Sequence, residues 1–215
     1  MNYIFLGLFI VATSIHLYGS WKQDKNMRAI SKGFIIAFLT GFYIFSVPEI
    51  NIYIILALAF SWIGDLLLII PGTKSFTAGG ISFMIGHAFF IVSYIGVTDL
   101  SLVSPYLIVI LGLVFLGVVT YIFYRLKPYL PKALFYPMAL YLLINGAMNC
   151  FAIYRLISYA YLGSILTAIG ALLFFLSDSS LFFVRFNKNS RLKTHFFVML
   201  TYSLGEFLII LGMII

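Results

Sequence analysis

The sequence predicts an all-α polytopic membrane protein with eight transmembrane helices in a single domain, residues 1–215. Of its 215 residues, 63% are hydrophobic and 9% are charged, and the mean hydropathy is +1.13. Soluble domains are only about 45–50% apolar. Apolar stretches run almost from end to end of the chain, and basic residues collect in alternate gaps between them. These observations exclude an ordinary soluble domain.

Each of eight apolar segments is long enough to cross a bilayer, which requires about 20 apolar residues per helix. The expected helices are 2–20, 31–47, 51–70, 78–97, 103–124, 133–153, 160–184 and 194–215. The first segment has no basic N-terminal region and no cleavage site, so it is expected to span the membrane rather than act as a signal peptide. Pro48 ends the second segment and Pro71 the third, Pro105 lies at the start of the fifth, and Pro128 and Pro131 precede the sixth.

The charges between the segments predict how the helices are oriented. Twelve of the thirteen basic residues lie in the gaps after the first, third, fifth and seventh segments: Lys22, Lys25, Arg28, Lys32, Lys74, Arg125, Lys127, Lys132, Arg185, Lys188, Arg191 and Lys193. The opposite side holds Arg155, Glu49 and Asp99. Because cytoplasmic loops carry the excess of Lys and Arg, both termini are expected to be extracytoplasmic. The net charge of +7 therefore indicates membrane topology rather than a nucleic-acid partner, and the membrane is the cytoplasmic (inner) one if the protein is bacterial.

Several kinds of chemistry are disfavoured by what the sequence does not contain. Cys150 is the only cysteine, which excludes an internal disulfide and a thiolate metal cage. There is no H-E-x-x-H, no G-x-S-x-G and no phosphate-binding Gly-rich loop, and the three histidines share no metal-binding spacing. No metal or other cofactor is expected, which leaves acid–base chemistry by carboxylates on a substrate that arrives from the bilayer.

Three acidic residues lie inside the apolar segments: Asp65, Asp178 and Glu206. An ionisable group at such a position costs about 2.5–3.5 kcal/mol or more, so each needs a partner, a watery cavity or a function. Asp65 and Asp178 lie at similar depths, about 9–11 Å from the basic ends of the third and seventh segments. Each segment is the third in its half of a four-plus-four division, which suggests two parallel four-helix repeats related by an axis along the membrane normal.

Two carboxylates that share a cavity of low dielectric constant cannot both ionise cheaply, so one would act as an acid and the other as a base. Asp65 and Asp178 are therefore the candidate catalytic pair. The alternative is that both are helix-end aspartates, which reach water or cap a backbone group.

Other polar side chains are candidates to support this pair. Ser82 and His87 lie within two turns of the fourth segment, where His87 either shuttles a proton or joins two helices. Tyr202 shares a helix face with Glu206, which lies deeper and is as well explained by a structural as by a catalytic role. Asn145 pairs with Asn149 in the sixth segment, and the joining of helices is favoured there over substrate binding. His16 and His195 are expected to be solvated near helix ends.

Three motifs resemble those of a known family. They are Ser61-Trp62-Ile63-Gly64-Asp65, Gly80-x-Ser82-Phe83-x-x-Gly86-His87 and Gly170-Ala171-x-x-Phe174-x-x-Ser177-Asp178. Together with the stretch from Tyr202 to Leu208 they cover most of the chain, and their order and spacing are similar to those of the YhhN-like family of membrane lysoplasmalogenases.

The resemblance implies an enzyme that hydrolyses the vinyl-ether bond of a lysoplasmalogen, releasing a fatty aldehyde and glycerophosphoethanolamine or glycerophosphocholine. It implies that Asp65 and Asp178 are the catalytic pair, with Ser61, Ser82, His87, Asn145, Ser177, Tyr202 and Glu206 as supporting or substrate-binding residues. Glu206 departs from the amide expected in the last helix of the family. The implied partners are a lysophospholipid substrate and membrane lipids, and cytoplasmic cations such as Lys74 or Arg185 would attract the phosphate.

A small proton-coupled transporter is the main alternative, because repeated halves and intramembrane carboxylates also suit a carrier. Transport requires access from both faces, whereas the polar residues cluster toward the cytoplasmic half. A purely structural or regulatory membrane protein is a third interpretation. The head group, the chain length and the oligomeric state are left open, and a homo-oligomer is compatible with the sequence.

Overall fold

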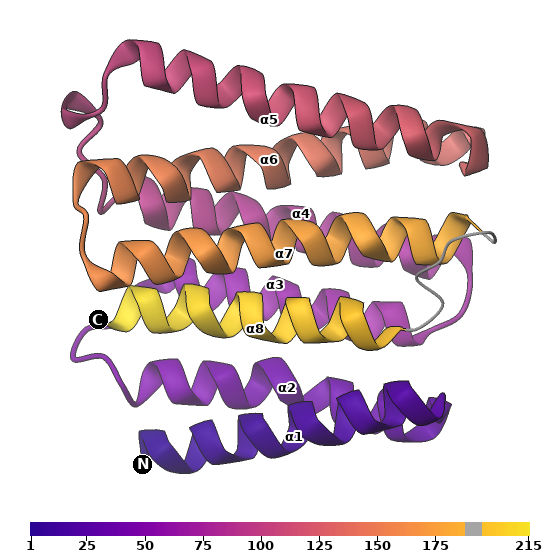
Figure 1. Ribbon diagram of the computed structural model, residues 1–215. Coiled ribbons are helices and arrows are strands. Elements are labelled where there is room, and N and C mark those ends of the chain that lie inside the picture. Colours follow the sequence, from indigo (N-terminus) through magenta and orange to yellow (C-terminus); the bar gives the residue numbers. More distant parts are fainter. Residues whose placement is uncertain (188–194) are drawn as a thin grey trace.

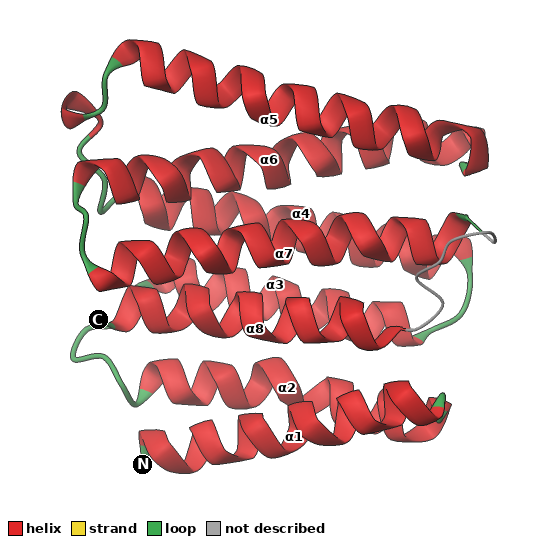
Figure 2. Cartoon of the chain, in the orientation of Figure 1, coloured by secondary structure: helices red, strands yellow, loops and turns green. Residues whose placement is uncertain are grey.

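The computed structural model describes residues 1–187 and 195–215, and within these ranges the chain forms eight long helices and three short 3₁₀ turns. The long helices are α1 (Asn2–Lys22), α2 (Lys25–Ile44), α3 (Ile52–Ile69), α4 (Thr73–Ile95), α5 (Pro105–Leu126), α6 (Phe135–Ser158), α7 (Leu162–Phe186) and α8 (His195–Ile214). The turns are η1 (Leu100–Leu102), η2 (Lys127–Tyr129) and η3 (Lys132–Leu134). Figure 2 shows helices and connecting loops throughout the described chain.

All eight helices are long and apolar enough to cross a membrane, which confirms the predicted all-helical fold and its helix count. The chain is therefore an integral multi-pass membrane protein. Successive helices run in opposite directions, and both termini lie at one end of the bundle (Figure 1). We call the other end, which holds Lys22, Lys74, Arg125 and Arg185, the basic end.

Antiparallel hairpins make up most of the packing. The pairs α1–α2, α3–α4 and α7–α8 have the most extensive contacts. Helix α8 also packs on α1 and α2, while α6 packs on α4, α5 and α7. Helix α5 lies at the edge of the bundle (Figure 1) and is almost entirely exposed on its outer side. Of the carboxyl-bearing helices, α7 and α8 are more than half buried, whereas α3 is about one-third buried.

Two helices begin earlier than predicted. Helix α2 starts at residue 25 rather than 31, because Asp24 caps it by accepting hydrogen bonds from the backbone N–H groups of Asn26 and Met27. Helix α4 starts at residue 73 rather than 78. Lys25, Arg28 and Lys74 were predicted to lie in gaps, and that prediction was wrong, because they belong to α2 and α4. Lys22, Arg125 and Arg185, also predicted in gaps, belong to the last turns of α1, α5 and α7. Their long apolar stems allow them to sit on a helix while the charge reaches a polar region.

Four more basic residues were predicted to lie in gaps. Lys188, Arg191 and Lys193 lie outside the described residues. Arg155, predicted in a gap, belongs instead to the last turn of α6, which extends to residue 158 rather than 153. Its guanidinium is buried, donating to the carbonyl of Gly212 at 2.9 Å and to the hydroxyls of Thr167 and Tyr161. Arg155 therefore ties α6 to α7 and α8.

Glycines bring α7 and α8 into backbone contact. A Cβ added at Gly170 would lie 2.7 Å from the carbonyl oxygen of Gly205 and 2.7 Å from the nitrogen of Ile209. A Cβ at Gly212 would overlap the carbonyl oxygen of Gly163. Only residues without a side chain permit this approach. The contact fixes the position of α8, and hence of Tyr202, relative to Asp178 on α7.

Candidate functional site

A cavity of about 500 Å³ opens at the basic end, and both Asp65 and Asp178 line it. Its other lining residues come from α1, α2, α3, α4, α7 and α8, so six helices contribute to one site. The two carboxyls, 113 positions apart in the sequence, thus face a common space. The shared cavity is the arrangement that a carboxylate pair requires.

Asp65, on α3, is held by a cation and a phenol. Lys32 Nζ on α2 lies 3.1 Å from Asp65 Oδ1. The hydroxyl of Tyr202 on α8 donates a hydrogen bond of 2.8 Å to Asp65 Oδ2. The aspartate is only 1% exposed. Each carboxylate oxygen therefore has its own partner, and the adjacent positive charge favours the ionised form of Asp65.

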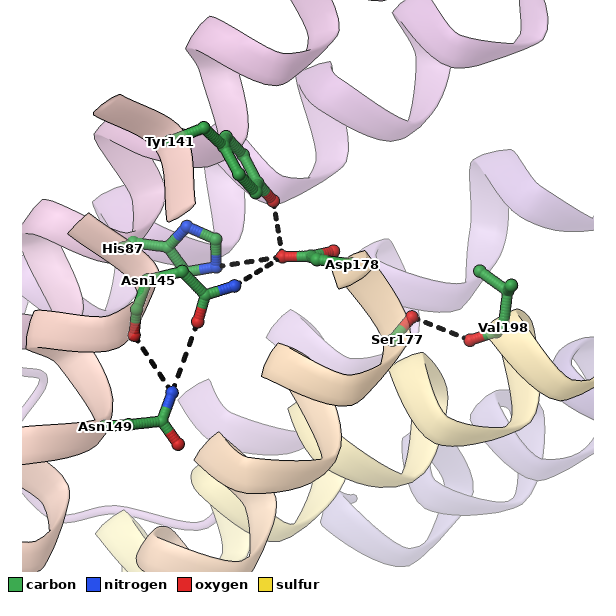
Figure 3. Close-up of polar contacts among 7 residues, drawn as sticks. All are labelled: His87, Tyr141, Asn145, Asn149, Ser177, Asp178 and Val198. Carbon is green, nitrogen blue, oxygen red and sulfur yellow. Dashed lines mark hydrogen bonds and ion pairs between the residues drawn. The ribbon is translucent and has the colours of Figure 1, made fainter. Parts of the chain in front are cut away.

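Asp178, on α7, has neutral hydrogen-bond donors instead (Figure 3). The hydroxyl of Tyr141 and the amide of Asn145, both on α6, donate to Asp178 Oδ2, the second at 2.7 Å. His87 Nε2 on α4 lies 3.6 Å from the same oxygen. The described residues give Asp178 Oδ1 no comparable hydrogen bond. One oxygen is therefore fixed by α6, while the other is available to the cavity.

The two aspartates thus have different surroundings, although the sequence alone made them equivalent. Among the described residues, Lys32 is the only lysine or arginine in ion-pair contact with a carboxyl inside the bundle. Asp65 is suited to remain a carboxylate. Asp178 is suited to carry a proton on Oδ1, because its donors all approach Oδ2.

Packed aromatic rings form part of the cavity wall. Phe83, Phe174 and Tyr202 pack edge to face, with ring centroids 5.3 to 6.2 Å apart. His87 lies against Phe174 at a centroid distance of 4.8 Å. Apolar walls of this kind lower the local dielectric constant, which strengthens the electrostatic effect of each charge in the cavity.

The mouth of the cavity is rich in positive charge. Lys25, Arg28, Lys32 and Arg185 all line it. The Nε of Arg28 is buried and has no hydrogen-bond partner among the described residues. Lys74, which the sequence suggested as a phosphate-binding residue together with Arg185, is not among the lining residues. The basic mouth can therefore attract an anionic group to the carboxyl pair.

The predicted serines mostly join helices. The Ser82 hydroxyl donates to the backbone carbonyl of Phe60 at 2.6 Å, linking α4 to α3. The Ser177 hydroxyl donates to the carbonyl of Val198 at 2.8 Å, linking α7 to α8 (Figure 3), although Ser177 also lines the cavity. Ser61 is buried on α3 and faces the Glu206 carboxyl. These geometries explain the serines without a direct part in chemistry.

Asn149 and His16 also take structural positions. Asn149 donates to the backbone carbonyl of Asn145 at 2.9 Å, within α6. His16 was expected to be solvated, which is wrong: it is 2% exposed and pairs with the Ser31 hydroxyl at 3.0 Å. Both His16 and His195 line the cavity.

Glu206 is fully buried on α8, and neither of its carboxyl oxygens has a hydrogen bond of good geometry within the described chain. It does not line the cavity that Asp65 and Asp178 share. The third acid therefore does not share the cavity with the pair.

Sequence reasoning did not propose two residues that contact the pair. Lys32 was counted only as a topological charge, and Tyr141 was not distinguished from the other tyrosines. The signal for Tyr141 is its position four residues before Asn145, which places both side chains on one face of α6. No group of three or more His, Cys, Asp or Glu side chains that could hold a metal ion occurs in residues 1–187 and 195–215.

The fold and the cavity together define a class: an eight-helix integral membrane protein with two buried aspartates in a cavity at its basic end. The chain belongs to the YhhN family, whose model matches residues 27–213. This range includes both aspartates and all the residues that contact them. No curated protein and no solved structure matches the chain. Membership of the family is consistent with a lysoplasmalogenase-like hydrolase.

Proposed function

We propose that the protein is a lysoplasmalogenase-like hydrolase, which cleaves the vinyl-ether bond of a lysoplasmalogen to a fatty aldehyde and glycerophosphoethanolamine or glycerophosphocholine. The observation that carries the proposal is that Asp65 and Asp178 line one cavity in different electrostatic surroundings. Acid-catalysed cleavage of a vinyl ether needs one group that gives a proton and one that stabilises a cation and takes a proton from water.

Asp178 is the proton donor in this proposal. Its Oδ1, which accepts no hydrogen bond from the described residues, transfers a proton to the vinyl carbon farther from the ether oxygen, and the double bond becomes an oxocarbenium ion. Tyr141 and Asn145 then stabilise the carboxylate that is left, because both already donate to Oδ2. His87, 3.6 Å from that oxygen, is placed to exchange a proton with Asp178.

Asp65 is the base. Its negative charge stabilises the oxocarbenium ion, and it accepts a proton from the water that attacks the carbon bonded to the ether oxygen. The product is a hemiacetal. This step resembles the work of paired carboxylates in glycoside hydrolysis. Lys32 and Tyr202 hold the carboxylate in place throughout.

Collapse of the hemiacetal completes the reaction. The Asp178 carboxylate takes up the proton of the hemiacetal hydroxyl, the bond from the hemiacetal carbon to the glycerol oxygen breaks, and the glycerol oxygen takes up the proton that Asp65 holds. One water is consumed, and both aspartates return to their starting forms. The glycerol product keeps the oxygen atom that it had in the ether, because the bond on the vinyl side of that oxygen breaks.

The basic end faces the cytoplasm in this proposal, following the positive-inside rule. The carrier hypothesis is less well supported, because the lining residues on α7 and α8 all come from the portions of these helices nearest the basic end. A carrier needs a second route to the opposite end.

The test is aldehyde release from lysoplasmenyl-ethanolamine and lysoplasmenyl-choline by purified protein, run in D₂O. The proposal expects one deuterium on the carbon next to the aldehyde, because the proton comes from an exchangeable carboxyl. Release of free fatty acid instead of aldehyde would contradict it. Solute uptake into vesicles without lipid consumption would favour the carrier.

A further inference from the structure

An apolar groove of about 320 Å³ lies on the lateral surface of the bundle, toward the basic end and between α4, α6 and α7. Its rim is exposed where a membrane protein meets lipid: Tyr136 is 86% exposed and Ile81 is 46% exposed. Its lining is almost wholly hydrocarbon and aromatic. The groove therefore presents a surface that suits a hydrocarbon chain rather than a polar solute.

A small pocket of about 20 Å³, which we call the passage, lies between this groove and Asp178. Phe76, Tyr141 and Phe182 line both the groove and the passage, and Asp178 lines both the passage and the main cavity. Tyr141, which donates to Asp178, thus also forms a wall of the groove. The groove and the basic cavity consequently meet at the carboxyl that gives the proton in the proposed reaction.

Phe76 lines the groove, the passage and the basic cavity, and we call its position the junction. Its ring packs edge to face on Phe182 at 6.1 Å and on Phe186 at 5.4 Å. The guanidinium of Arg185 lies over the same ring, 5.3 Å from its centroid. One face of the junction is therefore apolar, and the other bears a cation that lines the basic mouth.

We infer that the groove holds the single hydrocarbon chain of a lysolipid whose phosphate lies in the basic mouth, with the first carbons of the chain passing Phe76 to reach Asp178. This inference rests on the proposed function and assigns the two halves of its substrate to two surfaces. The groove, of about 320 Å³, has room for part of one hydrocarbon chain.

Continuity with the carboxyl pair distinguishes this groove from another. A larger apolar groove, of about 530 Å³, lies between α1 and α2. None of its lining residues lines the cavity that contains Asp65 and Asp178. Size alone therefore does not select the chain-binding surface.

The two surfaces have different energetic roles. Moving a chain from the bilayer into an apolar groove changes its surroundings little, because lipid tails are as apolar as the groove. The groove therefore positions the chain rather than supplying affinity. Affinity comes from the charge-assisted contacts of the phosphate with the cations of the basic mouth.

A larger side chain at position 80 would fill the groove. It lines both the groove and the passage, and a Cβ added there would meet nothing within 4 Å. Gly80→Leu should therefore fold normally while its side chain occupies the chain-binding space. Gly112→Leu on α5 is the matched control, since that glycine also has open space around its Cβ position and lies outside the groove.

The experiment is photolabelling with a 1-O-alkyl-lysophosphatidylethanolamine that carries a diazirine in the middle of its chain, followed by mapping of the labelled peptides. The saturated ether resists the proposed chemistry, so binding is measured without turnover. Label is expected on residues 76–84 and 134–141, and it should be lost in Gly80→Leu and retained in Gly112→Leu. Excess unlabelled lysolipid should compete, whereas excess diacyl phosphatidylethanolamine should not.

Several results would overturn the inference: label spread evenly over α5, label concentrated in the α1–α2 groove, unchanged labelling of Gly80→Leu, or equal competition by the diacyl lipid, which would indicate ordinary membrane lipid. Labelling as expected without aldehyde release would refute the proposed function but not the groove. Aldehyde release with label on other residues would refute the groove assignment but not the proposed function.

A second pair of variants tests whether the basic mouth binds the phosphate of the lysolipid. Arg28→Gln removes a cation from the basic mouth, and Arg125→Gln removes one at the basic end but outside the cavity. Labelling by the alkyl-lysophosphatidylethanolamine should require about tenfold more probe in Arg28→Gln and the parent concentration in Arg125→Gln. Equal weakening in both variants would mean that general positive charge, not a phosphate site, attracts the lipid.

Discussion

Lys32 Nζ lies 3.1 Å from Asp65 Oδ1, so a residue of α2 neutralises the buried carboxyl of α3. The lysine side chain is 13% exposed and that of the aspartate 1% exposed, and both residues line the cavity. Asp178 has no such cationic partner among the described residues, so the two aspartates differ in their surroundings.

Lys32→Met should lower the free energy of unfolding by about 3 kcal/mol, because it leaves the buried Asp65 carboxylate without a counter-charge. The double variant Lys32→Met with Asp65→Asn should recover most of that loss, since the unpaired charge is gone. Unfolding of the purified protein in detergent, followed by circular dichroism, measures both. Equal stability of Lys32→Met and the parent would mean that solvent already screens the pair.

Tyr141→Phe should slow aldehyde release about tenfold, which corresponds to about 1.4 kcal/mol of transition-state stabilisation. The variant removes one donor to Asp178 Oδ2 but keeps the ring that packs on Phe182. Initial rates at saturating substrate measure the effect. Tyr154→Phe is the control, because the Tyr154 hydroxyl bonds the carbonyl of Ile108 outside the cavity. A similar loss of rate in both variants would point to general destabilisation.

Glu206→Gln should retain aldehyde release within about threefold of the parent, a difference of less than 1 kcal/mol. The glutamate does not line the cavity, and neither of its oxygens has a hydrogen bond of good geometry within the described chain. An amide has nearly the same shape and no charge, so stability should be equal or higher. Loss of activity in a variant that unfolds at the parent's temperature would place Glu206 in the proton path.

Gly170→Ala should destabilise the protein by about 1–3 kcal/mol, because its Cβ would overlap the backbone of α8. The shift of α8 should also move Tyr202 away from Asp65 and lower the rate. Thermal unfolding and initial rates measure the two effects. Gly112→Ala should change neither, since open space surrounds that position on α5. A stable Gly170→Ala variant would mean that α7 and α8 pack less closely than described.

Hydropathy was sufficient to predict eight helices, because each segment needs about 20 apolar residues and few charges. It misplaced the starts of α2 and α4, since Lys25, Arg28 and Lys74 suggest a loop when composition is averaged. The Asp24 cap was a local signal that composition alone does not weigh. Because the basic residues indicated topology, Lys32 was counted among the loop charges and was not recognised as a partner of Asp65.

The candidate site was predictable where a residue type is rare in its surroundings. Asp65 and Asp178 stand out because carboxyls seldom occur in membrane spans. Tyr141 does not, because it is one of 15 tyrosines and its spacing of four residues from Asn145 does not by itself indicate a contact with Asp178. The contact of Tyr141 with Asp178 depends on how α6 packs on α7, which a single sequence does not show.

The predicted parallel repeat stays a prediction, although the packing has a corresponding pattern. Helix α2 packs on α3 as α6 packs on α7, and α8 packs on α2 as α4 packs on α6. Asp65 accordingly has partners on α2 and α8, and Asp178 has partners on α6 and α4. The partners differ in chemistry, which is why a duplicated arrangement can supply both an acid and a base.

The most direct test of the central claim, that Asp65 and Asp178 act as one unit, is the rate of aldehyde release by Asp65→Asn, Asp178→Asn and the double variant at equal folded protein. Each single variant should lose at least about a hundredfold in rate. The double variant should be no slower than the slower single variant, because residues that act together are not additive. A single variant that retains its rate, or losses that multiply in the double variant, would contradict the shared mechanism.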